Sequence, residues 1–241
     1  MKLLSWDVGI YNLSYCILEK KEDNTIKILD WNIINLVDNE EMKKNRSLIF
    51  ENIPRKLHEI PQLLNVDYVV IENQPSLKNP QMKSIQMILY SYFLILGKVI
   101  GNGENSTSYI NSIDFCSASN KLKIYDGPAI ILEKPIKRTK KNNKDAVDKN
   151  IEDEKVDNQK IDDNQKIDDN QNIEINKTKK STKTTIKYAD KKKLAIEHAK
   201  YFLRDQTPSY LSFFNDHKKK DDLSDSFLQG LYYLKKNIKF L

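Results

Sequence analysis

The sequence predicts an α/β domain with a mixed five-stranded sheet, in which three antiparallel strands are followed by parallel strands, and with helices that flank the sheet. Three observations support this prediction. The chain begins with three β-favouring segments joined by short turns, which is typical of antiparallel strands. A continuous β-branched run at residues 66–72 is typical of a central parallel strand. The closing segments repeat apolar residues at helical spacing.

The first two strands form a predicted hairpin. Residues 3–7 are a short apolar run that ends in Asp7, Gly9 lies in the turn, and residues 13–18 are a second apolar run. A charge at the end of a buried strand is costly unless it is paired or binds a metal. Asp7 therefore has two interpretations at this point: it caps the backbone of the turn, or it is a metal ligand.

A later predicted strand also ends in a carboxylate. Residues 25–34 alternate polar and apolar side chains, as a third strand should, and residues 42–64 have helical spacing with bends expected at Pro54 and Pro61. The next strand, residues 66–72, ends in Glu72. If this strand runs parallel to the first, Asp7 and Glu72 lie side by side. Two carboxylates that close repel each other unless a cation joins them.

A strongly apolar helix is predicted after Asn79-Pro80, which are typical N-cap and first-turn residues. Residues 81–99 are apolar on more than one face, which indicates deep burial or a partner surface, and we expect part of this helix to form a dimer interface. Residues 108–116 are predicted as the fifth strand, followed by a polar loop at residues 117–121.

Residues 133–185 differ in composition from the rest of the chain. Lysine, aspartate and asparagine dominate, and a six-residue unit repeats in tandem at residues 158–169. Such a segment buries too little apolar surface to order itself. We therefore expect a single domain made of residues 1–132 and 186–241, with a disordered insertion between them. We expect the function to survive deletion of residues 136–183.

Two helices are predicted to close the chain, the second of which begins near residue 218. Its first turn holds Asp221, Asp222 and Asp225, and acids there are favourable with the helix dipole. For Asp221 this explanation suffices. Asp222 and Asp225 stand three residues apart and share a face, and small polar residues are expected to line the surface nearby: Ser226, Gln229 and Gly230.

Composition and residue spacing bear on the partner, on the kind of metal site and on the cellular location. The chain has 241 residues, a net charge of +6 and 39% hydrophobic residues. Lysines of the insertion inflate this charge, so it is weak evidence for a nucleic-acid partner. The two cysteines lack metal-ligand spacing and indicate buried, reduced thiols. His58, His198 and His217 lack the spacing of a zinc site. No membrane-spanning segment and no leader peptide are expected, which predicts an intracellular protein.

Acids at the ends of two strands and on a late helix suit a divalent-metal site. Mg²⁺ prefers oxygen ligands and keeps water molecules for the substrate. Two such ions can activate the attacking water and stabilise the leaving oxygen of a phosphodiester. The pattern therefore favours a nuclease that needs no side-chain nucleophile.

Five stretches carry a family resemblance, and they are Asp7-Val-Gly-Ile-Tyr-Asn12, Val70-Ile-Glu72-Asn-Gln-Pro75, Asn79-Pro-Gln-Met-Lys-Ser-Ile-Gln86, Ser117-Ala-Ser119 and Lys219-Lys-Asp-Asp222-Leu-Ser-Asp225-Ser226. Together they resemble the RuvC-type Holliday junction resolvases of the RNase H-like superfamily, specifically the poxvirus-type branch found in large DNA viruses. The second, third and fifth stretches are the most specific. The resemblance covers nearly all of the chain outside the insertion.

The resemblance implies an RNase H-like fold and an endonuclease that cleaves Holliday junctions and branched intermediates of DNA replication, recombination and repair. It implies that two Mg²⁺ or Mn²⁺ ions are held by four catalytic acids: Asp7, Glu72, Asp222 and Asp225. Lys121 and Lys191 fall about where the family places phosphate-contacting bases. A homodimer is implied, and so is a location at replication sites in the host cytoplasm if the source is viral.

Other functions remain open on the sequence. A nuclease of the same fold that cuts RNA–DNA hybrids would use the same metal chemistry, and a junction-binding module without catalysis is the non-enzyme alternative. The second is disfavoured because an acidic cluster without a metal destabilises a fold. A proofreading exonuclease would need an Asp-x-Glu pattern where Asp7 is followed by Val8 and Gly9. An actin-like ATPase would need a second Asp-x-Gly hairpin.

Overall fold

One sheet organises the protein. The computed structural model describes residues 1–77, 79–101, 109–130, 132 and 188–236, so the insertion predicted at residues 133–185 lies outside the described residues. Within the described part the strands are β1 (Lys2–Asp7), β2 (Leu13–Lys20), β3 (Ile26–Ile34), β4 (Tyr68–Asn73) and β5 (Ser112–Ser117). They are arranged in the order β3-β2-β1-β4-β5. β1 pairs antiparallel with β2 and parallel with β4, which confirms the predicted mixed sheet.

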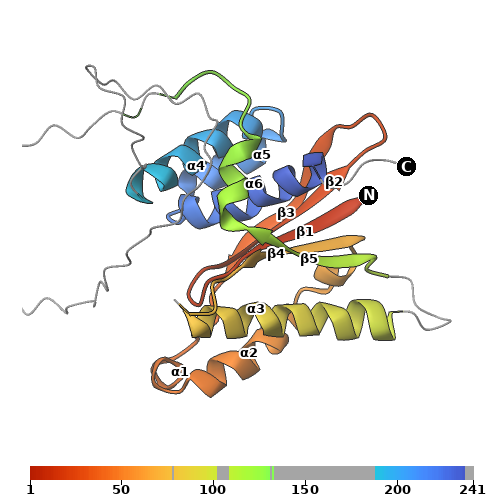
Figure 1. Ribbon diagram of the computed structural model, residues 1–241, viewed down its shortest axis with the longest axis vertical. Coiled ribbons are helices and arrows are strands. Elements are labelled where there is room, and N and C mark those ends of the chain that lie inside the picture. The colour runs from red at the N-terminus through yellow and green to blue at the C-terminus, as the bar shows by residue number, and fades with distance from the viewer. Residues whose placement is uncertain (78, 102–108, 131, 133–187, 237–241) are drawn as a thin grey trace, which may run out of the picture.

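Helices cover both faces of this sheet (Figure 1). One face carries α1 (Glu40–Lys44), α2 (Arg46–His58) and α3 (Pro80–Phe93). The other carries α4 (Tyr188–Leu203), α5 (Pro208–Asp216) and α6 (Lys220–Lys236). Three short helical segments join these elements: η1 (Pro61–Leu64), η2 (Leu94–Ile100) and η3 (Ala118–Ile124).

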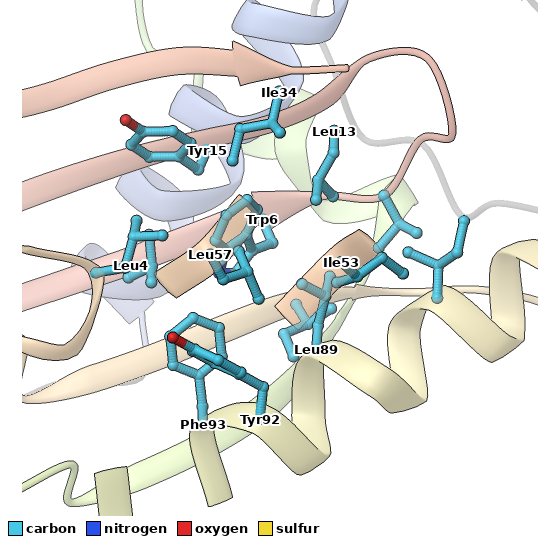
Figure 2. Packing of buried hydrophobic residues seen from close by; sticks show 14 of the residues in the cluster. Leu4, Trp6, Leu13, Tyr15, Ile34, Ile53, Leu57, Leu89, Tyr92 and Phe93 are labelled. Atoms are coloured by element: carbon cyan, nitrogen blue, oxygen red, sulfur yellow. The ribbon is translucent and has the colours of Figure 1, made fainter. Parts of the chain in front are cut away.

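Side-chain alternation along β1 assigns its residues to two cores. Leu4 and Trp6 point to the α2–α3 side, where Trp6 packs 6.1 Å from the ring of Phe93 (Figure 2). Leu3 points to the opposite side and packs beneath α6. Successive strand residues face opposite ways, so Asp7, four residues after Leu3, also faces α6. The strand thus places its terminal carboxylate on the helix-α6 side of the sheet.

Helix α6 lies against the strands through small polar residues. The Oγ atoms of Ser226 and Ser14 are 2.8 Å apart, and Gln229 Nε2 donates to the Trp6 carbonyl over 3.0 Å. A Cβ atom on Gly230 would come within 2.7 Å of Leu18 Cδ1. The prediction that these α6 residues line the site surface is therefore wrong. They are buried, because they allow α6 to approach the sheet closely.

The segment at residues 42–64 is more broken than its spacing predicts. Asn45 ends α1 and its side chain also caps α2 by accepting from the Ser47 N–H. Pro54 lies inside α2 without interrupting it, whereas Pro61 begins the separate turn η1. The sequence reasoning also missed α5, whose signal is the Thr207-Pro208 pair at the N-cap and first helical positions.

The helix at residues 80–100 bears on the expectation that the chain has no membrane-spanning segment. Residues 80–100, which comprise α3 and η2, are long and apolar enough to cross a membrane by length and composition, with a mean hydropathy of 1.2. In the fold, Ile85, Leu89 and Phe93 of this helix belong to the core beneath the sheet. A single helix of this kind is weak evidence for a membrane span, since core helices have the same composition.

Candidate metal centre

Two predicted acids meet at the carboxyl ends of β1 and β4. Trp6 pairs with Ile71 in the parallel register, so Asp7 and Glu72 are the next residues along the two strands. Each is only 8% exposed. The sheet therefore brings these carboxylates together, as the sequence pattern predicts, and the structure buries them on the α6 side. Gly9 supports the turn that follows Asp7, because a Cβ atom there would come within 2.4 Å of the Asn12 carbonyl oxygen.

Asp225 of α6 and Lys121 of η3 complete a compact charged cluster. The Nζ atom of Lys121 lies 3.7 Å from Asp7 Oδ1 and 3.4 Å from Glu72 Oε1, and it forms a close ion pair with Asp225 Oδ2. The Lys121 side chain is 15% exposed. The segment predicted as a polar loop is thus a helical turn that directs one lysine into the site. Three carboxylates surround one ammonium group, which leaves an excess of negative charge.

The surroundings of Asp7 and Asp225 disfavour the ionised forms of these two carboxyl groups. Burial raises the pKa of Asp7 well above its usual value, and repulsion by Glu72 raises it further. Burial also raises the pKa of Asp225, although Lys121 opposes that shift. For Lys121, burial favours the neutral amine, but the surrounding carboxylates raise its pKa well above the usual value. The lysine therefore stays charged and acts as the resident counter-ion of the cluster.

Asp222 lies at the edge of the cluster. Burial, followed by repulsion from Asp221, raises its pKa to about 6. Within the described part of the chain, no hydrogen bond or ion pair joins Asp222 to Asp7 or Glu72, although the charge of Asp225 contributes to its shift. The structure thus brings three of the four predicted acids together around Lys121 and leaves the fourth one helical turn away.

The neighbouring residues Lys191 and Lys192, in the first part of α4, differ in their contacts. Lys192 Nζ lies 2.7 Å from Asp221 Oδ2, at the start of α6. Lys191, the residue predicted to contact phosphate, is half-buried in the first turn of α4, and no ion pair of its side chain is found among the described residues. The placement of Lys191 against DNA therefore stays a prediction.

The donor set fits a divalent cation of the Mg²⁺ type. No group of three or more histidine, cysteine, aspartate or glutamate side chains in the described ranges has metal-binding geometry. The carboxylates of Asp7, Glu72 and Asp225 instead surround the Lys121 ammonium group. The three acids offer only oxygen atoms, which Mg²⁺ prefers. Burial raises the pKa of Asp7 and of Asp225, and three carboxylates face one ammonium group, so an added divalent cation would stabilise their ionised forms. His198 is not one of these donors, and its ring is stacked on Tyr125 with ring centroids 4.0 Å apart.

Comparison with solved structures identifies the fold. The fowlpox virus Holliday junction resolvase aligns with 98% of this chain and 99% of its own, at 16% identity and a TM-score of 0.52. The same resolvase in complex with substrate Holliday junction DNA aligns at 18% identity and a TM-score of 0.50. The yeast mitochondrial resolvase Ydc2 aligns with 97% of this chain and 78% of its own, at 15% identity and a TM-score of 0.52.

The chain has the RNase H-like fold of the Holliday junction resolvases. The fold expected from the poxvirus-type resemblance is therefore confirmed. No protein-family model matches the sequence. A curated relative, the uncharacterized protein L451 of Acanthamoeba polyphaga mimivirus, is 32% identical over 190 residues, which cover 76% of this chain. This chain spans about a third of that relative's length, since the match covers 33% of it.

Proposed function

We propose that this resolvase-like protein is a magnesium-dependent endodeoxyribonuclease that cleaves four-way DNA junctions and related branched intermediates. One observation carries the proposal: Asp7, Glu72 and Asp225 converge on a single cation although they come from three separate elements. This convergence occurs in a fold shared with fowlpox virus and yeast mitochondrial Holliday junction resolvases. One of the fowlpox structures is a complex of the resolvase with substrate Holliday junction DNA.

The acids of the cluster would hold the metal, with Mg²⁺ as the expected ion and Mn²⁺ as a substitute. A bound divalent ion would lower the pKa of an attacking water and stabilise the leaving oxygen of a phosphodiester. Asp7 and Glu72 provide a rigid base for it, because their backbones are fixed by strand pairing. Asp225 and Asp222 approach from α6, and together the four acids could hold a second ion.

Lys121 would have two roles in this proposal. Without metal, its ammonium group neutralises part of the cluster charge. With metal bound, its charge would become available to a phosphate of the DNA backbone. Lys191, in the first turn of α4, would make a further phosphate contact.

We also propose a homodimer formed through the outer face of α3 and η2. Met87, Ile95 and Val99 are 42%, 50% and 66% exposed, respectively. Ile95 follows Met87 by eight residues and Val99 follows Ile95 by four, whereas Ile85, Leu89 and Phe93 of the same helix pack into the core. Two active sites in a dimer would allow paired cuts across a junction. Cys16 and Cys116 are buried free thiols, which supports a location inside the cell, where thiols stay reduced.

Substrate choice tests the proposal. An immobile four-way junction, a linear duplex of the same sequence and an RNA–DNA hybrid should be incubated separately and in competition with the protein and Mg²⁺. We expect symmetric nicks on the junction, with little cutting of either competitor. Cutting of the hybrid in preference to the junction would move the function to RNA removal. Tight junction binding without cutting of any substrate would instead indicate a binding module.

A further inference from the structure

A buried glutamine on α3 is connected to the candidate metal centre. Gln86 is fully buried, and its Oε1 atom accepts two hydrogen bonds, one from the Gln74 backbone N–H over 2.8 Å and one from Lys83 Nζ over 3.1 Å. Gln74 in turn donates from its side-chain Nε2 to Glu72 Oε2 over 2.7 Å. A continuous chain of contacts thus runs from the core helix α3 to a carboxylate of the site.

The chain of hydrogen bonds fixes one oxygen of Glu72 and leaves the other for the cation. Oε2 of Glu72 accepts from Gln74, whereas Oε1 faces Lys121 Nζ at 3.4 Å. Gln74 lies just beyond the end of β4, where strand pairing no longer holds the backbone. Its bond to Gln86 replaces that support and keeps the Gln74 side chain within reach of Glu72.

Gln86 takes part in this series of hydrogen bonds as an acceptor, through its side-chain oxygen. Its Nε2 atom is buried and has no hydrogen-bond partner among the described residues. A buried donor without a partner destabilises a fold, so an apolar side chain of similar size would suit the core better. The accepted bonds to Gln74 and Lys83 are the contacts that an apolar residue could not make.

We propose that Gln86 and Gln74 are positioning residues that hold the Glu72 carboxylate with Oε1 directed toward the metal. This inference rests on the proposed function. Groups that orient a metal ligand from behind typically change metal affinity or activity by about 10–100-fold when they are removed. Gln74 acts on Glu72 directly, whereas Gln86 acts through Gln74.

The substitutions Gln74→Met and Gln86→Met test this assignment, because methionine has a similar length and removes the hydrogen-bonding amide. Binding of Mn²⁺ to the full-length, DNA-free protein should be measured by titration calorimetry, and unfolding should be followed in EDTA. We expect each variant to bind Mn²⁺ about tenfold more weakly than the wild type or worse. Gln81→Met, on the same helix, is the matched control and should bind Mn²⁺ as the wild type does.

The double variant separates positioning from general destabilisation. If both residues act through Glu72, Gln74→Met combined with Gln86→Met should weaken Mn²⁺ binding no more than the stronger single variant. Gln86→Glu keeps the acceptor oxygen and should restore much of the affinity lost in Gln86→Met. Wild-type affinity in Gln74→Met would overturn the inference, even if Gln86→Met failed to fold. A wild-type protein that binds no Mn²⁺ would overturn the proposed metal centre itself, and this inference with it.

Discussion

The ammonium group of Lys121 lies 3.4 Å from Oε1 of Glu72, although the two residues are 49 positions apart in the chain. The same ammonium contacts Asp7 and Asp225. A lysine therefore occupies the centre of the acidic cluster that we assign to the metal. This arrangement connects the stability of the metal-free protein to the same side chains that would hold Mg²⁺.

Replacement of Lys121 by methionine should destabilise the metal-free protein. The change leaves buried carboxylates without a counter-ion, and removal of one partner from a buried ion pair costs about 3–5 kcal/mol in the free energy of unfolding. Addition of Mg²⁺ should restore much of this loss, because the ion replaces the missing charge. Urea unfolding in EDTA and in Mg²⁺ would measure both effects.

Lys123 provides the control for this experiment. It lies on the same turn η3, but it is exposed and its Nζ contacts only the nearby Asn120 side chain, within the part of the chain that the structure describes. Lys123→Met should leave the free energy of unfolding nearly unchanged in both buffers. If Lys121→Met behaved like Lys123→Met in EDTA, the counter-ion role of Lys121 would be wrong.

The raised pKa of Asp222 predicts a pH dependence of stability. Its pKa is about 6 in the folded protein and 3.8 as the ordinary value, so the folded state holds this proton more tightly than the unfolded chain. The resulting stabilisation is fully present below about pH 4 and is lost as the pH rises through 6. In EDTA, Asp222→Asn should therefore gain stability relative to the wild type between pH 4 and pH 7.

Unfolding curves of both proteins across this pH range would check the sign. A stability difference that stays flat from pH 4 to pH 7 would contradict the assignment. Saturating Mg²⁺ should reverse the order at pH 7, because metal binding requires the ionised carboxylate that the variant lacks. A wild-type protein that gained no more from Mg²⁺ than Asp222→Asn would remove Asp222 from the metal ligands.

DNA binding should distinguish two neighbouring lysines of α4. Lys192 is held by Asp221, whereas no ion pair of Lys191 is seen in the described ranges. Lys191→Ala should weaken junction binding and lower the salt-dependence slope by about one, since each neutralised phosphate releases about one counterion. Lys192→Ala should lower the slope less. Affinity measured against salt concentration would decide, and an unchanged slope for Lys191→Ala would exclude that contact.

Ile95→Glu should convert the proposed dimer into monomers. Ile95 is 50% exposed on η2, whereas Ile88 packs partly against the core, so a charge at Ile88 would also damage the fold. Leu29→Glu, on β3, is the control, because Leu29 is an exposed apolar residue at another surface. Sedimentation analysis would report the oligomeric state. A dimer that persists in Ile95→Glu would place the interface elsewhere, and a monomeric wild type would contradict the dimer.

The sheet and its two strand-end acids could be predicted because local patterns determine them. A β-branched run that ends in Glu72 and an apolar run that ends in Asp7 indicate parallel neighbours, and the register confirms this. The acids of α6 were predictable from their spacing. The inward direction of Ser226, Gln229 and Gly230 was not, because it depends on how closely α6 packs against the sheet.

The contacts of Lys121, Gln74 and Gln86 could not be predicted from the sequence. Lys121 and Lys123 lie on the same short turn, and only the tertiary fold determines which of them points into the cluster. Gln74 and Gln86 both lie in stretches that carry the family resemblance, yet their mutual contact depends on how α3 packs under β4. Spacing identifies the acids, and the packing of elements determines what surrounds them.

The cleavage of an immobile four-way junction by Asp7→Asn, compared with the wild type in Mg²⁺, tests whether the acidic cluster performs metal-dependent cutting. Asp23→Asn, in the exposed turn between β2 and β3, is the matched control. We expect symmetric nicks from the wild type and the control and none from Asp7→Asn. The last variant should bind the junction as tightly or more tightly, because a negative charge near phosphate is lost. Cleavage by Asp7→Asn at the wild-type rate would contradict the metal-centre assignment.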